Sequence, residues 1–204
     1  MRRKNRDPRS WLIAIAEEMR AFRLSDSTGG NLSMRWGDLI YMTPRYAGSR
    51  NRWRLRPKDI VVFDMQTQTF FSRTREPSRE ARMHLEIYKS FPGVGAVIHA
   101  HPEYTMVFAC ARVPLEPTAE YTQKLGPIPL TQEAPAHSRR LAEVVVAELK
   151  NLGKEPEANG AAVLVPAHGV VCVGKDLDHT FTVLERVEIN ARISLYQWLM
   201  GERE

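Results

Sequence analysis

Residues 94–102 read Val-Gly-Ala-Val-Ile-His-Ala-His-Pro. The apolar and β-branched residues predict a buried strand over Val94–His99, and Pro102 favours the start of a helix that runs to Ala111. Because side chains alternate along a strand, His99 and His101 are expected on the same side of the sheet. This spacing suits chelation of a metal ion, although paired histidines inside a core would have the same spacing.

A third histidine, His168, lies in the segment Pro166-Ala167-His168-Gly169 between two apolar runs. The runs predict strands over 161–165 and 170–173, so His168 falls in the turn that joins them. Taken alone, it is equally consistent with an ordinary turn histidine. Three histidines with a vacant position are typical of catalytic zinc, whereas a structural site needs a fourth protein ligand. Cys110 and Cys172 occupy apolar surroundings that suit buried thiols in a reducing compartment.

Hydrophobic periodicity predicts the remaining elements. Helices are expected over residues 10–24, 79–91, 138–152 and 177–198, a hairpin over 32–42 and a strand over 60–63. Strands and helices alternate without strict βα repetition, and no Pro/Gly/Ser-rich linker divides the chain. We therefore expect one α/β domain over residues 1–204, with a largely antiparallel or mixed sheet and a flexible basic tail at residues 1–9.

The composition, 43% hydrophobic and 26% charged, is that of an ordinary globular protein. No apolar run is long enough for a membrane span or a signal sequence, which predicts a cytoplasmic protein without a membrane partner. The net charge of +5 is concentrated in separate arginine-rich segments. These segments lack aromatic interleaving and a reading helix, so a nucleic-acid partner is not expected.

An ordered set of motifs extends along nearly the whole chain, from about residue 10 to residue 198. It comprises Gly30-Asn31-Leu32-Ser33-x-Arg35, Thr43-Pro44, Pro77-Ser78-x-Glu80 with His84 and Tyr88, Phe91-Pro92-Gly93-Val94 through His99-x-His101-Pro102, and His168-Gly169-Val170 with Gly174-Lys175. In this order the motifs resemble the class II aldolase/adducin family. The resemblance implies a three-layer α/β/α fold around a largely antiparallel sheet and a homotetramer with sites at subunit interfaces. It also implies that His99, His101 and His168 bind the metal, with Glu80 as the catalytic carboxylate.

The chemistry of C–C bond cleavage agrees with such a set. Cleavage beside a carbonyl leaves an enediolate, which a divalent cation stabilises as a Lewis acid while a carboxylate moves the proton. Without the resemblance, Glu80 is interpreted as a first-turn glutamate that complements the helix dipole. His84 lies one turn after Glu80 and is expected to orient the carboxylate, to bind a substrate oxygen, or only to pack. His137 and His179 are interpreted as surface residues.

The segments that hold a phosphate in the resembling aldolases are altered in this chain. Asn31 and Ser78 fit the family pattern, but Arg45 and Arg79 stand where small residues are usual. Two guanidiniums could clamp a phosphate or a carboxylate, so we expect them to bind the anionic group of a small substrate. A tyrosine that some members supply from a neighbouring subunit has no clear counterpart, although Glu120 and Tyr121 lie in the corresponding region.

The sequence therefore predicts a metal-dependent aldehyde-lyase acting on a small, anionic, sugar-phosphate-like hydroxy-carbonyl compound. Zinc is the expected ion, with Mn²⁺ or Fe²⁺ as alternatives because imidazoles serve all three. A decarboxylase, dehydratase or 4-epimerase on the same scaffold and a non-catalytic adducin-like binding module remain alternatives. No NAD or ATP fingerprint is present.

Overall fold

The computed structural model describes residues 7–71, 75–153 and 155–201. Within these residues seven strands form one sheet in the order β4-β3-β2-β1-β5-β7-β6, and every neighbouring pair is antiparallel. The strands are β1 (Asn31–Trp36), β2 (Leu39–Met42), β3 (Val61–Asp64), β4 (Thr69–Phe71), β5 (Ala96–Ala100), β6 (Ala161–Val165) and β7 (Gly169–Gly174). The predicted α/β class with a largely antiparallel sheet is confirmed.

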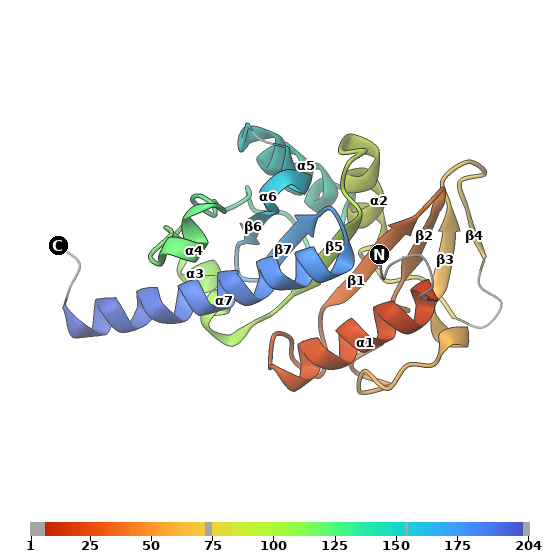
Figure 1. The fold of residues 1–204 in the computed structure, drawn as a ribbon, viewed down its shortest axis with the longest axis horizontal. Helices are drawn as coiled ribbons and strands as arrows, with labels where there is room; N and C mark the ends of the chain where they lie inside the picture. The colour runs from red at the N-terminus through yellow and green to blue at the C-terminus, as the bar shows by residue number, and fades with distance from the viewer. Residues whose placement is uncertain (1–6, 72–74, 154, 202–204) are drawn as a thin grey trace.

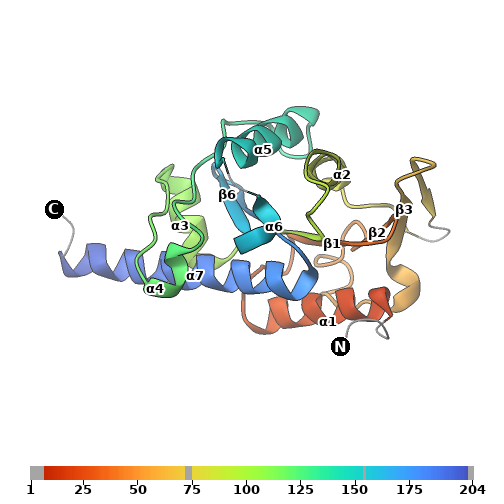
Figure 2. The same cartoon turned by 45° about the horizontal axis from the view of Figure 1, so that its top comes forward.

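Helices cover both faces of this sheet, which gives the predicted three layers (Figures 1 and 2). The longer helices are α1 (Pro8–Ala21), α2 (Ala81–Ser90), α3 (Glu103–Ala111), α5 (Arg139–Asn151) and α7 (Leu177–Met200). Figure 2 shows α2 and α5 on one side of the sheet and α1 and α7 on the other. The C-terminal end of α7 projects beyond the layers (Figure 1).

Each face of the sheet has its own hydrophobic core because side chains alternate along the strands. Leu32 and Ile98 belong to the core under α1, α3 and α7. Val97 and Val171 belong to the core under α2 and α5. His99 alternates with Ile98 and therefore lies on the α2 and α5 side of the sheet, together with Val97.

The register of the central strands brings the sequence motifs together. Asn31 of β1 is paired with His99 of β5, and Ala100 of β5 is paired with Val170 of β7. The residues just beyond β5 and just before β7 therefore meet at one end of the sheet. His101 follows β5 and His168 precedes β7, so this register places both beside His99.

The starts of α1 and α2 differ from the prediction by two residues. Helix α1 begins at Pro8, because the Asp7 carboxylate caps it by accepting hydrogen bonds from the backbone N–H groups of Arg9 and Ser10. Pro8 and Arg9 are thus helical, not part of a tail, and residues 1–6 of the expected tail lie outside the described residues. Helix α2 begins at Ala81, with Glu80 at its N-cap position.

Short elements were not predicted from the sequence. They are β4, the 3-10 helix Pro57–Asp59, α4 (Glu120–Gln123) and α6 (Pro156–Asn159). Each has only three or four residues, which is too short for periodicity to show. In the described part of the chain, no helix has the length and apolar character required to cross a membrane.

Candidate metal and active site

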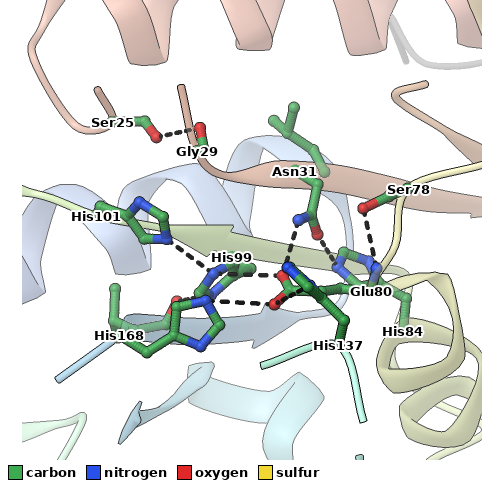
Figure 3. A network of polar contacts seen from close by, with 12 residues as sticks. Ser25, Gly29, Asn31, Ser78, Glu80, His84, His99, His101, His137 and His168 are labelled. Atoms are coloured by element: carbon green, nitrogen blue, oxygen red, sulfur yellow. Dashed lines mark hydrogen bonds and ion pairs between the residues drawn. The ribbon is translucent and has the colours of Figure 1, made fainter. Parts of the chain in front are cut away.

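Three imidazoles converge at the end of the central strands (Figure 3). One ligand atom from each of His99, His101 and His168 lies within 4.8 Å of the others, a spacing at which the three could hold one metal ion. The ring centroid of His99 is 4.9 Å from that of His101 and 4.7 Å from that of His168. The structure therefore brings together all three residues that the sequence analysis selected as ligands.

The hydrogen bonds of two of these rings leave a nitrogen free for a cation. His99 Nδ1 lies 3.0 Å from the carbonyl oxygen of Val170, and His101 Nδ1 lies 3.3 Å from a carboxylate oxygen of Asp26. Because both oxygens are acceptors, both Nδ1 atoms donate, and the two Nε2 atoms carry lone pairs. These Nε2 atoms are nevertheless 3.0 Å apart. A cation between them resolves the repulsion of the lone pairs, so the donor set fits a divalent metal ion.

Burial keeps the central imidazole in the form that binds metals. It lowers the pKa of His99 to about 3, which leaves the ring neutral near pH 7. His168 is partly buried, and burial likewise lowers its pKa. Neutral imidazoles do not have to release a proton before they coordinate a cation.

Asp26, which the sequence analysis did not select, supports His101. Burial raises the pKa of this carboxyl, but hydrogen bonds from the backbone N–H groups of Gly29 and Thr28 outweigh that effect and hold it at about 2. Gly29 also has a steric role, because a Cβ at this position would collide with the His101 ring. An Asp in a turn is common, so its sequence position alone carried no signal for this contact.

Glu80 lies beside the histidines and is 3% exposed. Its Oε2 accepts a hydrogen bond of 2.9 Å from the amide of Asn31 and lies 3.3 Å from His99 Nε2. Its Oε1 is buried and lies 3.3 Å from His168 Nε2 and 3.4 Å from His137 Nδ1. Burial favours the neutral acid, but the surrounding imidazoles and Asn31 lower the pKa of Glu80 below its ordinary value.

The N-cap position does not explain the placement of Glu80. Its side chain makes no capping hydrogen bond to the first turn of α2 and instead points at the histidines. The helix-dipole interpretation of this residue therefore has no support in its contacts. A buried carboxylate beside candidate metal ligands is suited to proton transfer.

A chain of hydrogen bonds behind Glu80 fixes Asn31. Since the Asn31 amide donates to Glu80, its Oδ1 accepts from His84 Nε2, and His84 Nδ1 must then accept from Ser33 Oγ at 2.6 Å. The Tyr88 hydroxyl donates in turn to Ser33 Oγ at 2.9 Å. Every member of this chain points its donor toward the carboxylate.

The position of His84 within these hydrogen bonds corrects the expectation that it binds substrate. His84 is completely buried in the core, where burial lowers its pKa to about 4, and the residues that line the cavity do not include it. It is connected to the Glu80 carboxylate only indirectly, through Asn31. Helical spacing predicted correctly that His84 faces the same way as Glu80, but not that Asn31 separates His84 from the cavity.

The histidines and Glu80 line a cavity of about 290 Å³. Asn31, Ser78, Arg45 and Arg79 all line it, so the structure assembles the expected anion-binding residues in one place. Arg45 donates to Glu76 at 2.7 Å through one nitrogen, while its buried Nε has no hydrogen-bond partner among the described residues. The guanidinium carbons of Arg45 and Arg79 lie 4.8 and 5.9 Å from the ring centre of Tyr46, so both side chains make cation–π contacts with this ring.

His137 is the cavity residue that the sequence analysis placed on the surface. Its side chain is 34% exposed, yet its Nδ1 lies 3.4 Å from Oε1 of Glu80. Its position comes from the loop before α5 and not from any strand or helix period, so no spacing rule could have found it. The other histidine that was expected on the surface is His179. It is half-buried at the start of α7 and does not line the cavity.

Comparison with known proteins identifies the family. A model of the Class II Aldolase and Adducin N-terminal domain matches residues 11–195. This chain is a member of the class II aldolase/adducin family. Among the relatives of this class II aldolase-type chain is the 5-methylthioribulose-1-phosphate/5-deoxyribulose-1-phosphate aldolase of Rhodospirillum rubrum. It is 31% identical over 183 residues, which are 88% of this chain and 76% of the relative.

Two fuculose phosphate aldolases are also similar to this class II aldolase family member. The L-fuculose phosphate aldolase of Methanococcus vannielii is 30% identical over 171 residues, covering 82% of this chain and 84% of the relative. A solved L-fuculose 1-phosphate aldolase superposes with a TM-score of 0.81 at 30% identity, covering 96% of this chain and 88% of that chain. The resemblance noted in the sequence is therefore confirmed.

Proposed function

We propose that this protein is a divalent-metal-dependent aldolase that cleaves a C–C bond in a small, anionic, sugar-phosphate-like hydroxy-carbonyl compound. The observation that carries the proposal is the meeting of three imidazole nitrogens with the buried Glu80 carboxylate in one cavity. Curated relatives that are named aldolases of ketose phosphates support the same reaction class.

In this proposal His99, His101 and His168 hold the metal ion, with zinc as the expected occupant. The bound ion supplies a Lewis acid for the negative charge that develops beside the substrate carbonyl. Glu80 moves the proton at the carbon next to that carbonyl when the C–C bond breaks or forms. Asn31 holds Oε2 of Glu80, so the carboxylate is oriented before substrate arrives.

The arginine side of the cavity is assigned to the anionic group. Arg45 and Arg79 can donate charge-assisted hydrogen bonds to phosphate or carboxylate oxygens. Ser78 Oγ accepts from the backbone N–H of Glu80 at 3.2 Å, which leaves its own hydroxyl proton free to donate to the anion. The second amide hydrogen of Asn31 is a further donor toward the cavity.

A homotetramer belongs to the same proposal. The projecting end of α7 leaves Leu199 and Met200 73% and 65% exposed, which is consistent with contact to another copy of this chain. Tyr121 is also exposed and could take part in such a contact.

The reaction is tested by supplying the metal-loaded protein with L-fuculose 1-phosphate and 5-deoxyribulose 1-phosphate. We expect an aldehyde and dihydroxyacetone phosphate in equal amounts, detected by coupled reduction of each product. Loss of carbon dioxide from acid analogues, loss of water, or inversion at C4 would instead assign the decarboxylase, dehydratase or epimerase. Absence of turnover on all of these compounds would favour the adducin-like binding module.

Replacing either cavity arginine is expected to weaken substrate binding without loss of metal. Arg45→Ala and Arg79→Ala each remove a charge-assisted contact worth about 1.5 to 3 kcal/mol, so KM should rise roughly 10- to 150-fold. The measurement is steady-state kinetics together with metal analysis. Arg139→Ala on the exposed face of α5 is the matched control and should keep the wild-type KM. Unchanged KM in both cavity variants would contradict the anion-binding role.

A further inference from the structure

His137 lines the cavity, but the function proposed above assigns it no role. It belongs to the loop before α5 and faces Glu80 and His168 (Figure 3). Its ring is nearly perpendicular to that of His168, with centroids 6.4 Å apart and an angle of 88°. About a third of the side chain remains open to the cavity.

The backbone of His137 is held in a left-handed conformation that is uncommon for residues other than glycine. Its φ is +63°, in the left-handed region where glycine and asparagine are favoured. Such strain persists where the surrounding structure requires it, and it clusters at functional sites. The loop could make the same turn at lower cost with glycine, but glycine would present no imidazole to the cavity.

The contacts of Glu80 decide which nitrogen of His137 carries the proton. Oε2 of Glu80 accepts a hydrogen bond from the Asn31 amide. The polar atoms nearest to Oε1 include His168 Nε2 at 3.3 Å and His137 Nδ1 at 3.4 Å. A ligating His168 Nε2 carries a lone pair toward the metal and cannot donate. Nδ1 of His137 is therefore the donor toward Glu80, and the neutral ring presents an acceptor at Nε2.

We propose that His137 is a specificity-determining residue that accepts a hydrogen bond from a substrate hydroxyl through Nε2 while Nδ1 faces Glu80. The proposal rests on the proposed function, because it assumes a hydroxylated substrate in this cavity. Arg45 and Arg79 offer only donors, which suit the oxygens of an anion. An acceptor at His137 Nε2 can be used by a hydroxyl group but not by an ionised oxygen, so it would distinguish the hydroxylated part of the substrate from its anionic group.

Two probes that differ by one hydroxyl group test this assignment. Binding of dihydroxyacetone phosphate and of hydroxyacetone phosphate, which lacks that hydroxyl, is measured by calorimetry on the zinc-loaded protein. We expect the wild type to prefer dihydroxyacetone phosphate at least about tenfold. His137→Asn should reduce this preference to about twofold or less, with affinity for hydroxyacetone phosphate nearly unchanged. Asparagine suits the left-handed backbone and keeps an amide donor for Glu80, but it has no atom at the place of Nε2.

A second variant separates this role from a structural one. His137→Gly removes the whole ring and relieves the backbone, so its Tm should equal or exceed that of the wild type while the preference is lost. His179→Asn, outside the cavity, is the control and should keep both properties.

An undiminished preference in both His137 variants, or a wild type that does not distinguish the probes, would overturn the proposal. Failure of the aldolase proposal would appear differently, as a wild type that distinguishes the probes but does not cleave ketose phosphates.

Discussion

Glu80→Gln is expected to lower kcat at least about 100-fold, the effect of removing a positioned acid or base. The amide has the size of the carboxylate, and its oxygen can still accept the hydrogen bond from Asn31. It cannot take up and return a proton at neutral pH. The fold and the saturated metal content should therefore remain, which makes the loss specific to turnover.

The measurement compares kcat at saturating zinc, with circular dichroism and metal analysis on the same preparations. Glu143→Gln is the matched control, because Glu143 lies on α5 and forms ion pairs with exposed arginines. It should turn over like the wild type. Wild-type kcat in Glu80→Gln on a substrate that the protein cleaves would exclude the proton-transfer role.

Removal of one histidine ligand is expected to abolish stable metal binding. We choose His168→Ala because its side chain is 20% exposed, whereas that of His99 is 2% exposed, so the cavity left by substitution is less damaging. The wild type should bind about one divalent ion per chain, and the two remaining imidazoles should bind it far more weakly. Turnover should fall with occupancy.

Occupancy is measured by elemental analysis after dialysis against a weak chelator, and folding by urea unfolding of the same samples. His179→Gln changes a histidine outside the site and should retain the ion. Full occupancy in a folded His168→Ala variant would remove His168 from the ligand set.

The three candidate ligand histidines and the residues around them differ in how far the sequence could predict them. His99 lies in β5 and His101 directly follows that strand, so alternation alone predicted that both point to the same side of the sheet. His168 lies 67 positions after His101 in the sequence. Its role followed from resemblance to a family, since no spacing connects residues on separate strands.

Two other histidines were assigned differently by the sequence and by the structure. His84 lies on the correct face of α2, but the register of β1 places Asn31 between it and the cavity. His137 lies in a loop whose path depends on how α5 packs beside α2 and β6. The presence of a histidine in the sequence does not indicate that its backbone is left-handed.

The sequence by itself determined the types of the longer elements and the faces of each, because alternation and helical periodicity act within a single segment. It also determined the presence of two adjacent imidazoles at the end of β5. Only the tertiary structure decided which of the six histidines meet Glu80. Contacts between distant segments depend on strand register and on the paths of loops, and these are set by the packing free energy of the whole chain.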